Sequence, residues 1–277
     1  MIDLHLHTTA SDGRCDPPTL VRLAWQAGLR TIAVTDHDTM AGVADAARAG
    51  RDFGIRVVAG IEITAVLDDG DVHVLGYFLE PDNRELTIFL EAQRADRVER
   101  ARAMTVRLAE LGKPIDLDAL LRPLATRPDW SIGRPAIAQA LVAAGHVNTP
   151  GAAFQQLIGE GCPAWTPRKG AAPGEVIQTI ARAGGVASLA HPGLIGHDEL
   201  IEGWVGDGLP AIEVHHSEHS AADVTRYAGL ARRFGLAISG GSDYHGDDRN
   251  GRSSLGTISL PAEEFAALEA CVTRPAA

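Results

Sequence analysis

The 277-residue sequence predicts an α/β fold, a barrel of parallel strands and crossover helices that is interrupted by a helical insertion. Three observations support this fold: strand and helix patterns alternate in the first third, the alternation stops in the middle, and it resumes towards the end. The first third predicts strands at 2–6, 31–35, 56–66 and 72–78 and helices at 17–27 and 41–53. Such alternation is typical of parallel strands joined by helices.

The alternation stops between about residues 96 and 171. Segment 84–111 predicts a long, charged helix that ends at Gly112–Lys113–Pro114, and 134–144 predicts another helix. After the strand at 72–78, no convincing strand appears until 186–190. We therefore expect residues 96–171 to form a helical insertion, and 1–95 together with 172–277 to form one α/β domain.

The alternation then resumes. Strands are predicted at 186–190, 211–215, 236–240 and 255–260, and helices near 197–204 and 220–234. The total of about seven or eight parallel strands suits a (β/α) barrel better than an open sheet. Periodicity alone does not decide between the two.

The charge of the chain limits its partners. The formal net charge is −11 and no long run of lysine or arginine occurs, which argues against broad binding of duplex DNA. Only 5% of the residues are aromatic, so stacking platforms for single strands are not obvious. A small phosphorylated substrate stays possible because bound metal ions can reverse the local field of an acidic protein.

The cysteines and the apolar segments indicate the cellular compartment of the protein. Cys15, Cys162 and Cys271 are scattered and form no C-x-x-C pair, as expected in a reducing cytoplasm. No segment approaches the run of about 18 apolar residues that spans a bilayer. We expect a cytoplasmic protein with no membrane contact, and no obligate protein partner is evident.

Histidines and carboxylates lie at the ends of the predicted strands. In parallel α/β folds those ends form the active-site face. His5 and His7 alternate with leucines, so both imidazoles project from one side of their strand. The other candidates at or near strand ends are Asp12, Asp36, His37, Asp38, Glu62, His73, His191, Asp243 and His245. So many successive strand ends with such side chains predict a site for several metal ions.

The motifs DLHLHTTASDG, TDHD, GIEIT, AHP and GSDYH resemble those of the polymerase-and-histidinol-phosphatase (PHP) domain, in the expected order along the chain. The resemblance covers both barrel portions, about 1–95 and 172–277. It implies a distorted (β/α)7 barrel with a trinuclear metal centre that hydrolyses phosphoesters.

The resemblance also divides the ligands among three divalent ions, with manganese expected and iron or zinc as alternatives. The first ion would be bound by His5, His7, Glu62 and Asp243. The second would share Glu62 as a bridging ligand and add His73 and His191. The third would be bound by Asp12, His37 and His245. A hydroxide bridging two ions would attack the phosphorus atom.

The insertion is similar to the cap of a family branch that removes the 3′-phosphate from nucleoside 3′,5′-bisphosphates, some members of which also trim short RNA from its 5′ end. This likeness makes Arg134 and Lys169 candidates for binding a substrate phosphate, with Ser131 beside them in SIGRP. The alternative is that Arg134 is a surface residue near a helix start and that Ser131 is the N-cap.

The remaining charged residues fit more than one role. His216, in a cluster with His215 and His219, is a candidate for protonating the leaving oxygen or for contacting a phosphate, and an ordinary loop role is equally open. The arginines of the long helix alternate with acidic residues, so we expect a solvated face with i,i+4 ion pairs. They are Arg94, Arg97, Arg100, Arg102 and Arg107.

Three other functions fit the same motifs. A 5′-to-3′ exoribonuclease would use the same centre repeatedly on a short RNA. A histidinol phosphate phosphatase would differ only in its substrate. A catalytically silent PHP scaffold is a third possibility. The complete set of ligand positions makes an active enzyme the better interpretation.

Overall fold

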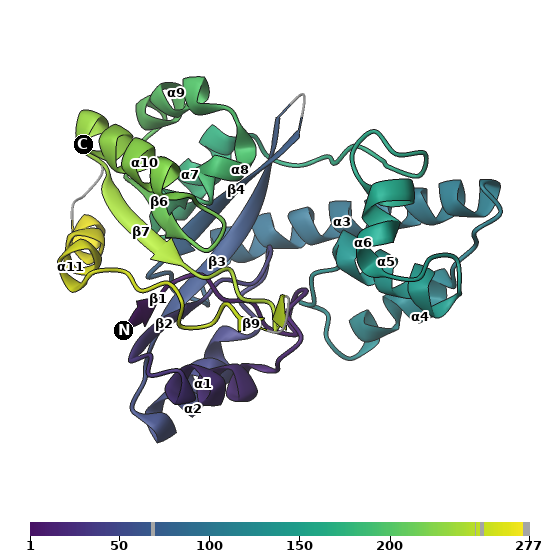
Figure 1. Ribbon diagram of the computed structural model, residues 1–277, viewed down its shortest axis with the longest axis horizontal. Helices are drawn as coiled ribbons and strands as arrows, with labels where there is room; N and C mark the ends of the chain where they lie inside the picture. The colour runs from purple at the N-terminus through teal and green to yellow at the C-terminus, as the bar shows by residue number, and fades with distance from the viewer. Residues whose placement is uncertain (68–69, 247, 250–251, 274–277) are drawn as a thin grey trace.

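In the computed structural model, seven strands form one sheet that curls nearly into a barrel, with a helical lobe beside it (Figure 1). The structure describes residues 1–67, 70–246, 248–249 and 252–273. The strands lie in the sheet in chain order: β1 (Ile2–Asp3), β2 (Thr31–Val34), β3 (Arg56–Leu67), β4 (Gly70–Tyr77), β5 (Val186–Leu189), β6 (Ala211–His216) and β7 (Ala237–Gly241). The predicted fold class is confirmed.

The two edges of the sheet meet. After β1, the chain continues beside the end of β7, where Leu4 N donates to Gly240 O at 3.1 Å and His7 N donates to Tyr244 O at 2.9 Å. Leu6 forms a parallel bridge with Tyr244. These bonds bring the segment with His5 and His7 next to the segment that carries Asp243 and His245.

The orientation of β4 corrects the prediction of an all-parallel barrel. β4 pairs antiparallel with both β3 and β5, whereas the other neighbours in the sheet pair in parallel. Only two positions, 68 and 69, separate β3 from β4 in the sequence. A connection this short joins antiparallel strands, because a parallel crossover needs a dozen or more residues.

The prediction of a strand at 255–260 is wrong. Residues 255–257 form a turn and residues 258–260 have no regular structure. Leu260 N donates to Ile2 O at 2.9 Å, so the segment lies beside β1. Pro261 follows directly and has no N–H to continue a ladder. Helix α11 (Ala262–Ala270) begins there.

The predicted helices of the barrel are present and pack outside the strands (Figure 1). Asp16 caps α1, accepting from Thr19 N at 2.8 Å, and α2 ends at Gly54, whose φ of 66° suits a glycine C-cap. The helices that match the predictions are α1 (Pro17–Gln26), α2 (Val43–Phe53), α9 (Ile201–Gly206) and α10 (Ala221–Phe234). Two further helices, α7 (Pro173–Arg182) and α8 (Pro192–Ile195), were not predicted.

The helical lobe has its own hydrophobic core, formed by residues such as Met104, Leu108, Ile137 and Leu141. Helix α3 (Arg84–Glu110) starts at the barrel and extends into this lobe (Figure 1). The lobe continues with α4 (Leu117–Leu121), α5 (Arg134–Ala143), α6 (Pro150–Ala153) and a π-helical turn (Phe154–Ile158). The expected boundary at residue 96 falls inside the continuous helix α3, and we keep the division into barrel and cap as a proposal.

The arginines of α3 correct the prediction of a solvated face. Arg94, Arg97 and Arg100 are buried, whereas Arg102 and Arg107 are exposed as expected. The buried arginines repeat at three-residue spacing and share one side of the helix with Ala101 and Met104. On this side Arg94 and Arg97 contact Asp38 of the barrel, whereas Ala101 and Met104 pack in the core of the lobe. The arginines therefore occupy positions where a helix usually places apolar residues.

Candidate metal centre

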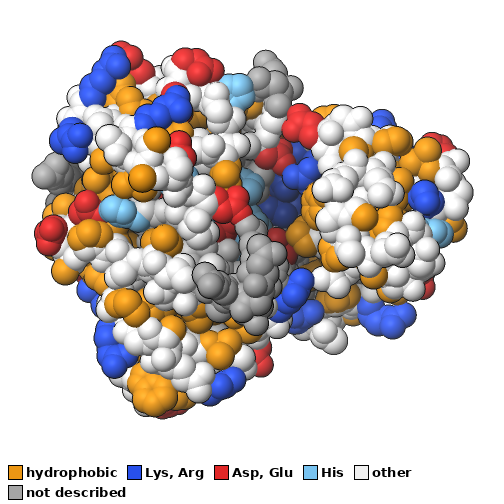
Figure 2. Space-filling view, viewed as in Figure 1, with side chains coloured by type: hydrophobic (Ala, Val, Ile, Leu, Met, Phe, Trp, Pro, Cys, Tyr) orange, Lys and Arg blue, Asp and Glu red, His pale blue; other side chains and the backbone are white. Residues whose placement is uncertain are grey.

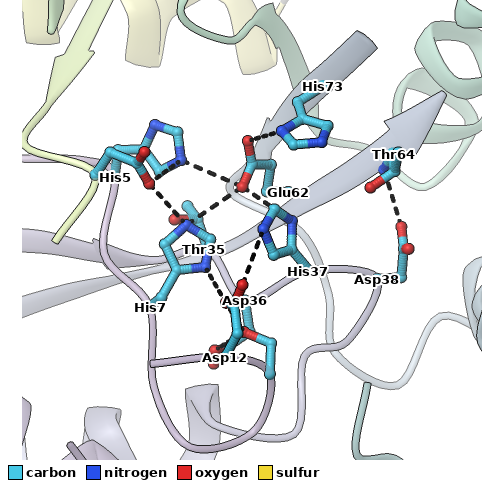
Figure 3. Close-up of polar contacts among 12 residues, drawn as sticks. His5, His7, Asp12, Thr35, Asp36, His37, Asp38, Glu62, Thr64 and His73 are labelled. Atoms are coloured by element: carbon cyan, nitrogen blue, oxygen red, sulfur yellow. Dashed lines mark hydrogen bonds and ion pairs between the residues drawn. The ribbon is translucent and has the colours of Figure 1, made fainter. Parts of the chain in front are cut away.

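Glu62 stands at the centre of the nine predicted metal ligands, with the imidazoles of His5, His7, His37 and His73 around it (Figure 3). One oxygen, Oε2, lies 3.4 Å from His5 Nε2, 3.2 Å from His7 Nε2 and 3.1 Å from His37 Nδ1. The other, Oε1, lies 2.8 Å from His73 Nδ1 and 3.0 Å from His191 Nε2. The two oxygens therefore face different sets of histidines, as a bridging ligand requires.

The position of Glu62 follows from the β3–β4 pairing. Thr64 lies opposite His73 in the antiparallel register, and Glu62 is two residues before Thr64 on the same face of β3. His73 and Glu62 therefore project to the same side of the sheet. The β4 orientation that the sequence did not predict is what brings these two side chains together.

Asp12 gathers the remaining predicted ligands. Its carboxylate lies 3.3 Å from His245 Nε2 and 3.7 Å from His37 Nε2. Asp36 holds the loop of Asp12, accepting from Thr8 N at 2.7 Å and from Ser11 Oγ at 2.6 Å. Asp243 lies 3.4 Å from His5 Nε2 and 3.2 Å from His7 Nε2. The structure brings all nine predicted ligands together, and their division among ions stays a prediction.

Unsatisfied nitrogens show that the cluster fits metal ions. His7 Nε2 lies 3.2 Å from oxygens of both Glu62 and Asp243, but at angles that do not make hydrogen bonds. Buried imidazole nitrogens are rarely left without a partner. Among the described residues, those that lack a hydrogen bond are His5 Nε2, both ring nitrogens of His7, His37 Nδ1, His191 Nδ1 and His216 Nε2. Convergent imidazole nitrogens and carboxylates of this kind suit Zn, Mn or Fe.

Metal binding should release protons at neutral pH. Burial lowers the pKa of His7, but its contacts with Asp243 and Glu62 outweigh burial and raise the pKa to about 10. At His191 the hydrogen bond to Glu62 likewise outweighs burial and raises the pKa. Because imidazole binds metals only in its neutral form, each ion displaces protons and its affinity should rise with pH. Calorimetric titrations with Mn²⁺ at pH 7, in two buffers of different ionisation enthalpy, should show net proton release; the same observed enthalpy in both buffers would contradict this.

The backbone at the site is strained at three residues. Asp38, His191 and Asp243 have φ values of 50°, 26° and 54°. This region of backbone conformation is unfavourable for residues other than glycine. Such residues cost on the order of 1–3 kcal/mol each and cluster at functional sites. Pro192 restricts His191 further. The surrounding fold holds these residues in orientations that the local sequence disfavours.

Glu213 is a buried acid that was not predicted from the sequence as part of the site. Its Oε1 lies 3.0 Å from His5 Nδ1, and its Oε2 accepts from His191 N at 2.7 Å. A carboxylate that accepts a hydrogen bond from the ring nitrogen that does not bind the metal fixes the orientation and the tautomer of the histidine. The signal was present, because Glu213 stands in the apolar strand AIEVH as Glu62 stands in GIEIT.

The four residues predicted around the substrate differ in how closely they approach this cluster. His216 is buried, with Nε2 3.7 Å from Asp243 Oδ2. Arg134 begins α5 and its guanidinium lies 5.8 Å from the centre of the Phe154 ring. Lys169 is exposed. Ser131 is not the N-cap of α5, because that position belongs to Gly133; its hydroxyl is buried without a hydrogen-bond partner among the described residues.

The loop that carries His37 is fixed from the helical lobe. Arg97 Nε lies 2.5 Å from Asp38 Oδ2, and Arg168 Nη1 lies 3.5 Å from the same oxygen. Burial raises the pKa of Asp38, but these two guanidinium groups outweigh burial and lower it. Asp38 N also donates to Glu62 O at 2.9 Å. Neither arginine was predicted to have a role.

The lobe also contacts the loop of Asp12. Ser131 N donates to Ala10 O at 3.0 Å, and Trp130 Nε1 donates to Ser11 O at 3.2 Å. Histidine, acidic and basic side chains are visible together in the cleft between the lobes (Figure 2). Residues from the lobe therefore reach both sides of the metal centre.

Comparisons with known proteins agree with this geometry. The model of the PHP domain matches residues 3–110. A 3′,5′-nucleoside bisphosphate phosphatase of Chromobacterium violaceum is 33% identical, with 99% of each chain covered. A 5′-3′ exoribonuclease of Haemophilus influenzae is 33% identical over 88% of this chain and 89% of that protein. The structure of a proposed metal-dependent phosphoesterase from Bifidobacterium adolescentis has a TM-score of 0.88 at 34% identity, covering 98% and 96% of the two chains.

The fold and the site together define a barrel phosphoesterase that binds divalent metal ions. The chain belongs to the PHP-domain family. Among the described residues, no helix is both long and apolar enough to cross a bilayer.

Proposed function

We propose that the chain hydrolyses the 3′-phosphate of nucleoside 3′,5′-bisphosphates to give nucleoside 5′-monophosphates. The observation that carries the proposal is the likeness to the C. violaceum phosphatase of that name, which extends over both the barrel and the helical lobe. The lobe lies beside the metal centre, where its shape would select the substrate. Likeness over the whole chain therefore supports the substrate as well as the reaction type.

The donor set supports three divalent ions. His5, His7, Glu62 and Asp243 lie together, as do Asp12, His37 and His245 with His7. His73 Nδ1 and His191 Nε2, 3.3 Å apart, share Glu62 Oε1. When bound, the ions would lower the pKa of a coordinated water and neutralise charge on the phosphate oxygens. Manganese is our first candidate, and iron and zinc suit the same ligands.

The remaining groups would orient the phosphate and supply a proton. Arg134, Lys169 and Ser131 would hold the phosphate oxygens, with arginine suited to a bidentate contact. His216 Nδ1 accepts from Glu218 N at 3.2 Å, so the proton of the neutral ring is on Nε2, which faces the cluster. This tautomer supports His216 as the donor to the leaving oxygen rather than as a metal ligand.

Exoribonuclease activity is a second candidate, because the H. influenzae exoribonuclease is 33% identical to this chain, as is the C. violaceum phosphatase. The same metal centre would then cleave successive phosphodiesters. Histidinol phosphate is a poorer candidate, since Arg14 lines the pocket beside the metal centre and would repel its ammonium group.

A substrate panel tests the proposal. We expect kcat/KM for adenosine 3′,5′-bisphosphate to exceed that for histidinol phosphate by at least about tenfold in Mn²⁺-loaded protein, because unmatched polar groups penalise the wrong substrate. A labelled short RNA in the same assay distinguishes the second candidate, and chelator-treated protein is the blank. Faster release of 5′ nucleotides from the RNA, or faster turnover of histidinol phosphate, would overturn the proposal.

A further inference from the structure

A pocket of about 270 Å³ opens next to the metal centre, between the barrel and the helical lobe. The barrel contributes Asp12, Arg14 and His245, two of which are predicted metal ligands. The lobe contributes Pro135, Gln139 and Phe154. A phosphate ester bound at the metal ions can extend into this pocket with the rest of its molecule. The volume is just below the usual range for small-molecule sites, so the ligand part would be small.

The lobe side of the pocket is built around one aromatic ring. Phe154 is half-buried and opens the π-helical turn Phe154–Ile158. Its carbonyl accepts from Gly159 N at 2.9 Å, which fixes the turn. The Arg134 guanidinium lies 5.8 Å from the ring centre, within the range of a cation–π contact.

We propose that this pocket binds the nucleobase, with the base stacked on the Phe154 ring; the inference rests on the function proposed above. A flat, heteroaromatic ring fits a pocket with one aromatic wall and proline beside it. The Gln139 amide has both donors and an acceptor for the edge of a base. Arg14 places positive charge at the barrel side, where it suits the second phosphate of a bisphosphate.

Stacking on one ring has a consequence for specificity. Every base has a π-face, so the ring selects for the presence of a base and tolerates changes in its identity. Phe154 is then a specificity-determining residue that distinguishes nucleotides from phosphorylated sugars. It would not take part in the bond-breaking step.

Two variants and two substrates test the inference. Phe154→Leu keeps an apolar side chain in the lobe core but removes the ring, and Phe154→Tyr keeps the ring. The substrates are adenosine 3′,5′-bisphosphate and ribose 3,5-bisphosphate, which lacks the base. We expect Phe154→Leu to lower the ratio of kcat/KM for the nucleotide to that for the sugar by about tenfold to hundredfold, mainly through KM. Phe154→Tyr should restore the ratio.

Phe53→Leu is the matched control, because Phe53 is also half-buried but packs against Trp25 on the outside of the barrel. An unchanged ratio in Phe154→Leu would overturn the inference, as would an equal loss on both substrates. If the wild-type protein hydrolyses neither substrate, the proposed function fails. The pocket is then judged by calorimetric binding of adenosine 5′-monophosphate, where weaker binding to Phe154→Leu supports the inference and no binding to wild type, or equal binding, overturns it.

Discussion

Glu62→Gln should lower turnover by at least about 10³-fold and remove bound metal in the same measurement. The side chain is buried and its two oxygens face different histidines, three at Oε2 and two at Oε1. Glutamine keeps the shape, but its neutral amide has one oxygen and cannot bridge two cations. Metal ions contribute several kcal/mol of transition-state stabilisation, and about 4 kcal/mol corresponds to a factor of about 10³.

Metal content per chain by atomic emission, measured beside kcat, checks this expectation. Glu91→Gln is the matched control, because Glu91 is an exposed glutamate on α3. It should keep both metal and activity. Three ions per chain in Glu62→Gln would contradict the bridging role, and full activity in verified metal-free wild type would contradict the metal mechanism.

The sequence predicted the metal cluster because the signal is local. Histidines and carboxylates directly follow apolar strand segments, and in a barrel those ends share one face whatever the lengths of the helices between them. His37, after the strand at 31–35, and His191, after the strand at 186–190, could be predicted as ligands without knowledge of distant contacts. Glu62 is different, since it stands inside a strand, but an acid among apolar residues is itself a signal.

The features that the sequence did not predict depend on pairing and packing between distant segments. β4 is antiparallel because only two positions connect it to β3. The alternating pattern predicts a strand but does not give its direction. Arg97 alternates with acids along the helix and resembles a solvated residue until the barrel buries it against Asp38, 59 positions earlier. Phe154 has no local mark of a binding residue, because its pocket forms only when the lobe packs beside the loop of Asp12.

Arg97→Met should destabilise the metal-free protein by about 3 kcal/mol, at the lower end of the 3–5 kcal/mol typical of broken buried ion pairs. Arg97 and Asp38 are both buried, and the guanidinium also donates to Thr64 Oγ1 at 2.9 Å and to Ile132 O at 3.1 Å. Methionine fills similar space but leaves the Asp38 carboxylate short of a cation. Arg168, 3.5 Å from the same oxygen, offsets part of the loss.

The same substitution should weaken Mn²⁺ binding by about tenfold to hundredfold, the usual effect of removing a group that orients metal ligands. Asp38 follows His37 directly and its N–H donates to Glu62 O, so a displaced Asp38 moves both ligands. Urea unfolding of metal-free protein and calorimetric Mn²⁺ titration measure the two effects. Arg102→Met, an exposed arginine of α3 that pairs with Glu99, is the control and should change neither. Loss of stability with unchanged metal affinity would show that Arg97 only holds the lobe to the barrel, whereas loss of both links the lobe to the geometry of the metal centre.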